Sequence, residues 1–340
     1  MFGNSDKYVA DLRTRLWVEG TINNNWKYTG MLQNVQKLTD NDGNDDVKLK
    51  RAYLEGRLGG TDVVAGRYNM LVADGNVFDG TVDGVAASYG EKVKVTAFAG
   101  KASDGFTVLP AAVHEIGGDG YINGDLNTAG DYIGVAVDTK IGEKLGFSVG
   151  YADFSKIGED YELYEGPTIT NTGASNGIFN VGLTYDVDKN LRLGATYLRG
   201  DLSVDLYDVE LDGEKITDEA DTEDVAEVQG KVDAVTDRLL EDDGFVLSVD
   251  YKGVNKADKG SWGAWAKYYD QGAHTYLAHT TDANTFGMTG FEGYGVGVDY
   301  AVAKNIVASV AYYDTESKLV KKLGGKLDDQ RLWTSVQFYF

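Results

Sequence analysis

Arginine in the first third of the chain stands where it would share one face of an extended strand. The residues concerned are Arg13, Arg15, Arg51, Arg57 and Arg67. Alternate residues of a β-strand point to the same side, so each group presents fixed positive charge on one surface. Such a surface can bias which ions enter an aqueous pore. It can also pair with Glu19 and Glu55 across strands and stiffen a wall. The residue pattern alone leaves both roles open.

The residues that could bind a metal ion, bind a nucleotide or catalyse a reaction are not spaced for any of these functions. His114, His274 and His279 fall in expected loops, and the chain has no cysteine and no evident third ligand, which disfavours a metal site. The acidic stretch 40–46 lacks a glycine at its sixth position and has Arg51 where a calcium loop needs glutamate. No glycine-rich phosphate cradle and no Ser–His–carboxylate group is evident. We therefore expect no cofactor, no metal and no enzymatic activity.

The elements that must position the arginines are amphipathic strands. In the last segment Leu332, Val336 and Phe338 lie on one face, and Ser335 and Gln337 lie on the other. The same alternation recurs along the chain, with aromatic residues near the ends of many apolar faces, as in the girdles of membrane barrels. It predicts strands at about 8–20, 26–37, 46–58, 61–70, 84–90, 92–100, 131–138, 145–152, 177–185, 191–199, 244–252, 261–269, 291–300, 306–314 and 331–340.

The apolar face of these strands must meet lipid rather than a protein core. A soluble sandwich also alternates, but its strands are usually shorter. An arginine that faces lipid at mid-bilayer costs roughly 2–4 kcal/mol. Arg13 and Arg15 at consecutive alternate positions must therefore face water. The sequence predicts an all-β fold, an antiparallel transmembrane β-barrel with a polar lumen.

Composition agrees with one large barrel domain over residues 1–340. The chain has 340 residues, 44 glycines, 22 tyrosines and only 2 prolines, and nothing in it marks a linker. The absence of cysteine suits an oxidising envelope compartment. The net charge of −22 argues against a nucleic-acid partner, because phosphates would be repelled.

Short and long connections alternate between the expected strands. Outer-membrane barrels place short turns in the periplasm and long loops outside, and those of bacteria normally have an even number of strands. We therefore expect about 16 strands, with the first one missing or short, either in residues 1–7 or upstream of Met1. The longest loop, 200–244, is expected to carry a helical insert at about 222–240, where apolar residues recur at helical spacing.

With one strand restored upstream, residues 71–84 form the third external connection. Their sequence is Leu-Val-Ala-Asp-Gly-Asn-Val-Phe-Asp-Gly-Thr-Val-Asp-Gly. At this point the chain resembles the general trimeric porins, whose third loop folds inward and faces an arginine ladder on the wall. That resemblance makes the five arginines wall residues of a pore constriction. It makes the constriction loop a segment with the acids Asp74, Asp79 and Asp83, anchored by Phe78.

The triplet 66–68 (Gly-Arg-Tyr), the triplet 83–85 (Asp-Gly-Val) and the aromatic carboxy-terminus look most like the porin barrel of OmpM-type outer-membrane proteins. Those proteins usually add an S-layer-homology domain, which is not visible here. The resemblance makes Phe338 and Phe340 an assembly signal read by the barrel assembly machinery. It implies a homotrimer in the bacterial outer membrane, in contact with lipid and lipopolysaccharide. The expected function is passive diffusion of small hydrophilic solutes and ions. The alternative is an anchoring barrel in which transport is incidental.

Overall fold

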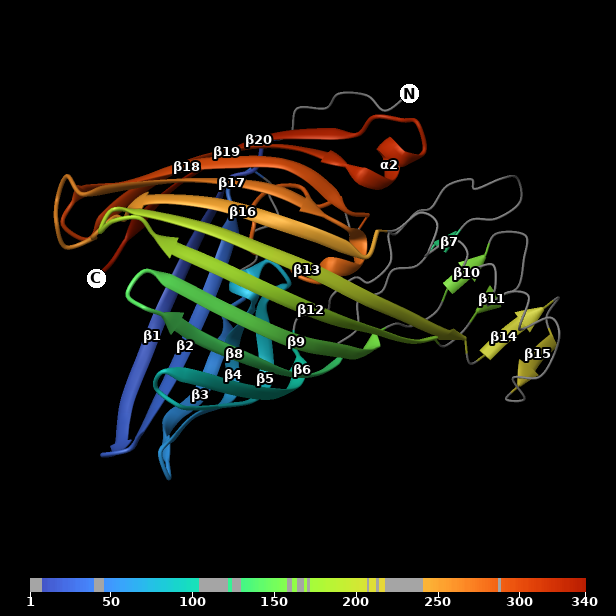
Figure 1. The fold of residues 1–340 in the computed structure, drawn as a ribbon, viewed down its shortest axis with the longest axis horizontal. Coiled ribbons are helices and arrows are strands. Elements are labelled where there is room, and N and C mark those ends of the chain that lie inside the picture. Colours follow the sequence, from blue (N-terminus) through green and yellow to red (C-terminus); the bar gives the residue numbers. More distant parts are fainter. Residues whose placement is uncertain are drawn as a thin grey trace.

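The computed structural model describes residues 8–39, 46–103, 122–123, 130–157, 161–163, 168–169, 172–206, 208–211, 214–217, 241–286 and 289–340. Within these residues, 15 strands form one sheet, and each pairs with its neighbours antiparallel (Figure 1). The predicted fold class is confirmed. In sheet order the strands are β1 (Asp11–Asn23), β2 (Trp26–Lys37), β3 (Lys48–Leu58), β4 (Thr61–Val72), β5 (Phe78–Tyr89), β6 (Val93–Ala102), β8 (Asp131–Ile141), β9 (Leu145–Ile157), β12 (Thr172–Asp186), β13 (Leu191–Leu206), β16 (Asp243–Lys252), β17 (Trp262–Gln271), β18 (Phe291–Ala303), β19 (Ile306–Ser317) and β20 (Asp328–Phe338).

Several strands are longer than the apolar alternation predicted. Strands β12 and β13 stay paired out to Thr172 and Leu206, well beyond the expected ends at 177 and 199. The ladder continues because backbone N–H and C=O groups pair whatever the side chain is, whereas the apolar pattern ends where the strand leaves the lipid. The expected boundaries therefore mark the membrane-facing part of each strand better than its hydrogen-bonded length.

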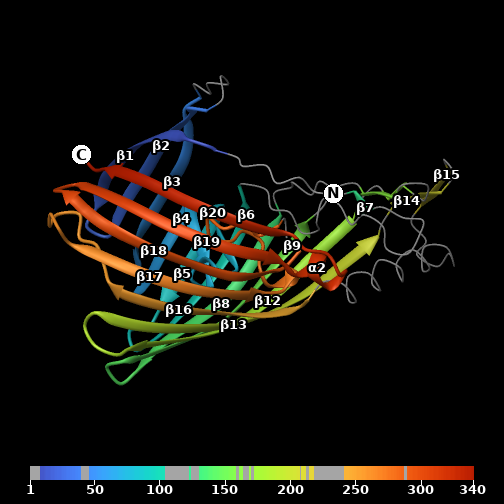
Figure 2. The same ribbon diagram turned by 90° about the horizontal axis from the view of Figure 1, so that it is seen from above.

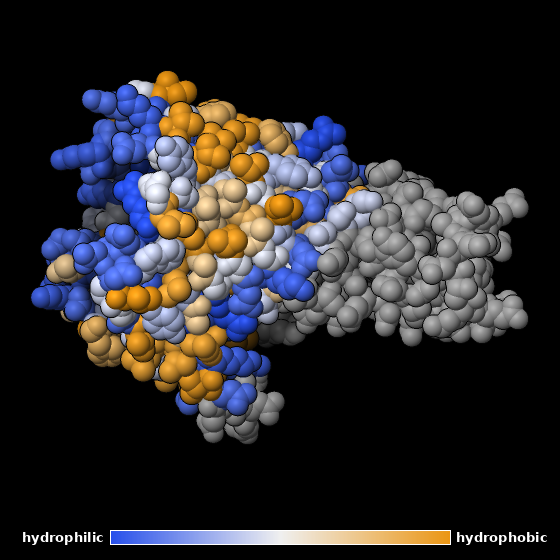
Figure 3. Space-filling model, turned by 90° about the horizontal axis from the view of Figure 1, so that it is seen from below, coloured by the Kyte–Doolittle hydropathy of each residue, from blue (hydrophilic) through white to orange (hydrophobic). Residues whose placement is uncertain are grey.

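The two faces of the sheet differ in the way that a membrane barrel requires. On β16 the outward Leu247 is 46% exposed, whereas its neighbour Val246 points inward and is 3% exposed. Outward tyrosines form cross-strand neighbours, for example Tyr268 opposite Tyr294. The surface view shows a broad apolar band over the strands, with hydrophilic residues at both ends of the band (Figure 3). Exposed apolar side chains in such a continuous band indicate contact with lipid.

Most connections at one end of the sheet are tight turns, such as those between β1 and β2, β3 and β4, and β18 and β19. Strands β1 and β20 occupy the two edges of the sheet order, and both run toward this end. A direct pair between them would be parallel, whereas every pair in the sheet is antiparallel. One strand of opposite direction would restore the alternation. The expected sixteenth strand lies outside the described residues and stays a prediction.

At the opposite end the long connections carry further elements. A small sheet contains β7 (Ile122–Asn123), β10 (Tyr161–Leu163), β11 (Thr168–Ile169), β14 (Asp208–Leu211) and β15 (Glu214–Thr217). Figure 1 shows these strands beyond the ends of the wall strands, and Figure 2 shows the same for β7, β14 and β15. The helix α2 (Lys318–Lys322) begins after Ser317, whose hydroxyl accepts a hydrogen bond from the backbone N–H of Val320. The helical insert expected at about 222–240 lies outside the described residues. Among the described helices, none has the length and apolar character needed to span a membrane.

The sidedness of β16 can be tested with two adjacent residues. Replacing the outward Leu247 with arginine should lower the free energy of unfolding from lipid vesicles by roughly 2–4 kcal/mol, because a guanidinium then meets hydrocarbon. Replacing its inward neighbour, Ser248→Arg, is the matched control and should cost clearly less. Urea titration of both variants measures the difference, and equal losses would contradict the assigned faces.

Candidate functional site

The paired ends of β4 and β5 leave the wall and cross the interior. Pairing of β3 with β4 ends at Ala52 opposite Arg67, and pairing of β5 with β6 begins at Val82. Between these points β4 and β5 stay paired with each other up to Val72 opposite Phe78. We call residues 68–82 the inner hairpin. Its connecting turn, η1 (Ala73–Gly75), contacts β12, which lies several strands away in the sheet (Figure 1).

Glycines lie in register where the hairpin leaves the wall. Gly66 is opposite Gly84, and Gly84 is opposite Gly100. Gly66 has a φ of +120°, and a Cβ there would come within 2.5 Å of the carbonyl oxygen of Ala52. A Cβ at Gly84 would collide with the hydroxyl of Tyr132. A row without side chains permits the close backbone approach that the bend requires.

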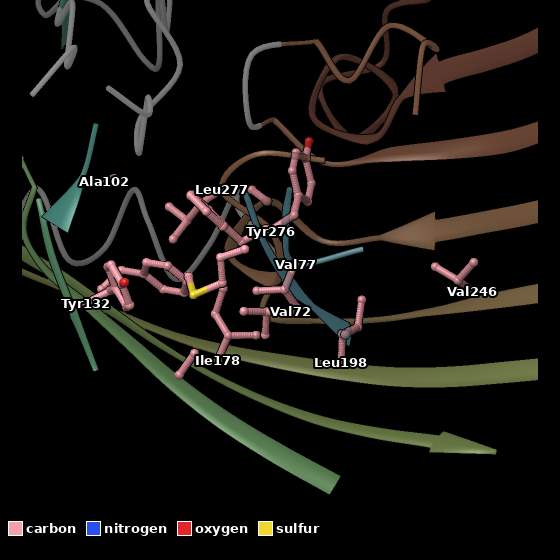
Figure 4. Packing of buried hydrophobic residues seen from close by; sticks show 14 of the residues in the cluster. Val72, Val77, Ala102, Tyr132, Ile178, Leu198, Val246, Tyr276 and Leu277 are labelled. Atoms are coloured by element: carbon pink, nitrogen blue, oxygen red, sulfur yellow. The ribbon is translucent and has the colours of Figure 1, made fainter. Parts of the chain in front are cut away.

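One face of the inner hairpin is apolar and packs on the inside of the wall. Tyr68, Met70 and Val72 of β4 are buried with Phe78 and Val82 of β5. They belong to one cluster with wall residues from β8 to β13, namely Phe154 and the residues Tyr132, Ile178 and Leu198 that Figure 4 labels. The ring of Phe78 lies 5.5 Å from that of Phe154. Each such side chain contributes about 1.5–3 kcal/mol of burial, which holds the hairpin across the lumen.

The opposite face of the inner hairpin is polar and is reached by an arginine from β3. Arg51 donates from Nη1 to the hydroxyl of Thr81 at 2.7 Å and from Nη2 to Asn69 Oδ1 at 2.6 Å. Asn69 in turn donates to the carboxylate of Asp79 at 2.8 Å. These bonds join the wall to the hairpin and fix the orientation of the Asp79 carboxylate.

Arg67 and Asp83 form a bidentate pair at the base of the hairpin. Arg67 donates from Nε and Nη2 to the two carboxylate oxygens of Asp83, at 2.8 and 2.6 Å. The residues are direct cross-strand partners on β4 and β5. The expectation that Asp79 and Asp83 lie in a loop is wrong, because both belong to β5 and only residues 73–77 connect the strands. The glycines of this segment allow a bent strand where the sequence predicts a loop.

The other predicted wall and loop residues lie apart from this pair, and Arg13 on β1 is 4.0 Å from Asp11 of the same strand. Asp74 has a positive φ of 54° at the hairpin tip, and its charge interacts with Asp138 on β8 and Arg192 on β13. Arg15 donates to Gln33 Oε1 at 2.8 Å on the lumen side of β1. Arg57 lies beside the turn at residues 59–60, 3.6 Å from Asp62. The structure therefore brings Arg51 and Arg67 to the inner hairpin but leaves Arg57 near the other end of the barrel.

A second stretch of chain, for which the sequence predicts only a long loop, also enters the interior. We call residues 272–286, which follow β17, the inner segment; it includes η2 (Ala273–Thr275). Its backbone bonds to the tip of the inner hairpin. The N–H of Leu277 donates to the carbonyl of Val77 at 2.9 Å, and the N–H of Thr280 donates to that of Gly75 at 2.9 Å. An apolar run in a loop, Tyr276 to Ala278, was the available signal.

The wall holds the inner segment from behind. Asn176 Nδ2 donates to the carbonyl of His274 at 3.0 Å, and both residues are buried. Gly200 lies so close to His274 that a Cβ there would collide with its carbonyl. The Tyr276 hydroxyl donates to the carbonyl of Thr285 at 2.9 Å, which closes the segment on itself. Figure 4 shows Tyr276 and Leu277 on the other side of Val72 and Val77 from Ile178 and Leu198.

His279 is enclosed by aromatic rings where the two inward elements meet. Its ring centroid lies 5.5 Å from that of Tyr269 and 5.4 Å from that of Phe291. One ring nitrogen bonds Gln271 Oε1 at 2.6 Å, and the other accepts from the N–H of Thr281 at 3.1 Å. Burial lowers the pKa of His279 to about 3, with a smaller effect from the charge of Lys267. Within the described residues, no group of three or more His, Cys, Asp or Glu is placed to hold a metal ion.

No family model and no curated protein matches the sequence. Solved structures do match the fold. OmpT, an outer membrane protein of Vibrio cholerae in its trimer form, aligns with a TM-score of 0.51 at 12% identity, over 96% of this chain and 91% of OmpT. A loop L8 deletion mutant of OmpT gives a TM-score of 0.50 at 15% identity, over 96% and 90% of the two chains. A mutant of Rh. blastica porin gives a TM-score of 0.47 at 12% identity, over 97% and 90%.

The two OmpT likenesses and the sidedness of the sheet define the class of fold. The chain has the fold of an outer-membrane β-barrel, which crosses the membrane with many antiparallel strands. Inside that barrel lie the inner hairpin and the inner segment, bonded to each other and packed on the wall.

Phe78 can be tested as the anchor of the inner hairpin. Phe78→Ala should lower the free energy of unfolding by about 3–5 kcal/mol, because it removes a fully buried ring and leaves a cavity against Phe154. Leu71→Ala, on the opposite face of the same hairpin, is the control and should cost far less, since Leu71 is 58% exposed. Urea unfolding in vesicles compares them, and a neutral Phe78→Ala would show that the hairpin is held by other contacts.

His279 predicts an acid-sensitive contact between the two inward elements. Its pKa falls from an ordinary value of 6.5 to about 3 in the folded protein, so below about pH 6.5 the opened segment takes up a proton that the closed one does not. The free energy of opening should therefore fall by about 1.4 kcal/mol for each pH unit below 6.5, until about pH 3. Hydrogen exchange of the amides of residues 277–280 measures it. The His279→Gln variant should lose this slope, and an unchanged slope would assign it to another group.

Proposed function

We propose that this protein is an outer-membrane porin, a passive water-filled channel for small hydrophilic solutes and ions. The observation that supports it is the polar face of the inner hairpin, which carries Asn69 and Asp79 and is bonded to Arg51 of the wall. An apolar plug has no need of charged groups on an exposed face. A hairpin that is apolar toward the wall and polar on its other face suits a narrowed aqueous passage.

The proposed selectivity follows from fixed charge in a narrow waist. In this proposal the arginines of the wall, with Arg13 and Arg15 on β1, face the carboxylates of the inner hairpin, and the field between them would lie across the path of a solute. A solute with a dipole can align in that field, whereas an apolar solute must disrupt ordered water without compensation. Charge at the waist also biases which ions enter. No step of such diffusion needs a cofactor or a catalytic residue.

The assembly and partners belong to the same proposal. We infer a homotrimer in the bacterial outer membrane, and the description of OmpT in a trimer form supports that state by likeness of fold. The outward apolar band would contact lipid and the lipid part of lipopolysaccharide. Phe338, the last residue of β20, and the exposed Phe340 would serve the barrel assembly machinery as a terminal signal.

Planar-bilayer recording with the purified protein tests the channel. Stable conductance in steps of three would support the trimeric porin. Silence at high protein load would overturn it and favour the anchoring barrel. Turnover of lipid or peptide that a single substitution abolishes would instead identify an enzyme.

The arginines of β1 give the channel a quantitative test. Arg13→Gln with Arg15→Gln should raise the single-channel conductance and move the reversal potential toward cation preference, because two positive charges leave the lumen wall. The control, Lys189→Gln with Lys259→Gln, removes the same charge from exposed residues of the short turns. If both pairs behave alike in a salt gradient, Arg13 and Arg15 do not belong to the narrowest zone.

A further inference from the structure

Asp282 lies where the inner segment meets the first and last strands of the sheet. Arg331 of β20 donates from Nη1 to the backbone carbonyl of Asp282 at 2.7 Å. Arg331 points into the lumen, since it is the cross-strand partner of the buried Tyr313. The Asp282 side chain is exposed to the interior.

The electrostatic surroundings of Asp282 include arginines of two strands. Partial burial of its carboxyl group raises the pKa of Asp282, and the charges of Arg331 and Arg13 act in the opposite direction. Its carboxylate is therefore within electrostatic reach of arginines on both β1 and β20.

The backbone on both sides of Asp282 is fixed. On one side the N–H of Thr281 donates to His279, and the N–H of Ala283 donates to the hydroxyl of Thr281 at 3.1 Å. On the other side the hydroxyl of Thr315 donates to the carbonyl of Asn284 at 3.2 Å. Ala283 is buried in a cluster with Ala311 and Tyr313, on which Trp265 and Trp333 pack. The carboxylate is thus held at a set position in the lumen, as a fixed charge must be to act on passing ions.

The acids of the inner hairpin are placed differently. Asp83, at the base of the inner hairpin, already receives two hydrogen bonds from Arg67, so the charges of the pair largely cancel for a solute at a distance. Asp282 lies beside Arg331 and near Arg13, and each of these arginines also pairs with a carboxylate of its own strand, Asp329 and Asp11. Among the described residues the Asp282 carboxylate has no ion pair within 4.0 Å, so its charge is less cancelled by its neighbours than that of Asp83.

We propose that Asp282, carried by the inner segment, is a specificity-determining residue that supplies a fixed negative charge to the waist beside Arg13 and Arg331. The proposal rests on the channel function above and adds which carboxylate sets the balance between cations and anions. The favoured solutes are cations, and zwitterions whose ammonium group passes on the side of Asp282 and whose carboxylate passes on the side of the arginines.

Reversal potentials in a potassium chloride gradient test this assignment on the full chain. Asp282→Asn should lower the ratio of cation to anion permeability by about twofold to fivefold, the range expected for one unit charge a few ångströms from an ion in water. Asp282→Glu keeps the charge and should have the same ratio of cation to anion permeability as the native protein. The control Glu143→Gln removes the same charge from an exposed residue of a short turn and should leave the ratio unchanged.

The outcomes separate this inference from the channel itself. If the native protein conducts and Asp282→Asn has the native ratio, or falls no further than Glu143→Gln, the inference is overturned and the channel stands. If the native protein is silent under all conditions, the channel and the inference both fail. A fall that Asp282→Glu does not rescue would assign the effect to a shift of the backbone and would also overturn the role of the charge.

Because the chain has no cysteine, Asp282→Cys introduces a single thiol that can be tested even if that variant does not conduct. Beside Arg13 and Arg331, the thiol should react severalfold faster with an anionic thiosulfonate than with a cationic one of similar size. Adding Arg331→Gln should reduce that ratio. Equal rates for both reagents would mean that the arginines do not act on this position, which would overturn the proposal.

Discussion

The structure depends on a constraint that lipid imposes on the backbone. A membrane interior offers no hydrogen bonds, so every N–H and C=O in it must be paired within the protein, and a closed antiparallel sheet achieves this. That geometry sends successive side chains to opposite sides, one toward hydrocarbon and one toward water. The outward Leu247 and its inward neighbour Ser248 show the two sides within one strand. Chemistry in this protein is therefore confined to the inward residues and to chain that enters the lumen.

Two pieces of chain use the interior in the same way. The inner hairpin and the inner segment each bury an apolar side and keep polar groups where water remains. Phe78, Tyr276 and the wall residue Phe154 belong to one core cluster, so the lumen contains a small hydrophobic core of its own. In this arrangement burial takes place against the wall and leaves the opposite surface free for charged groups.

The sequence was sufficient for the fold because alternation is local and repeats along the chain. That the inner hairpin enters the lumen was predicted only from the resemblance to porins. The prediction placed Asp79 and Asp83 in a loop, although both belong to β5, because a bent strand and a loop can have the same composition. Arg57 was grouped with the other arginines because it lies on the same face of its strand. Its position along the barrel axis depends on strand register, and that position is next to a turn. The inner segment was missed because its partners, Val77 and Asn176, are distant in sequence.

The backbone bonds between the hairpin tip and the inner segment have a mechanical consequence. Leu277 and Thr280 bond the carbonyls of Val77 and Gly75, so neither element can swing away without breaking pairs in the other. Thermal fluctuations of the inner hairpin and the inner segment should then be small and correlated, because the two elements are bonded to each other and each is attached to the wall. Insertions that lengthen the long connections would leave these bonds intact, so those connections can diversify while the inner hairpin and the inner segment keep their arrangement.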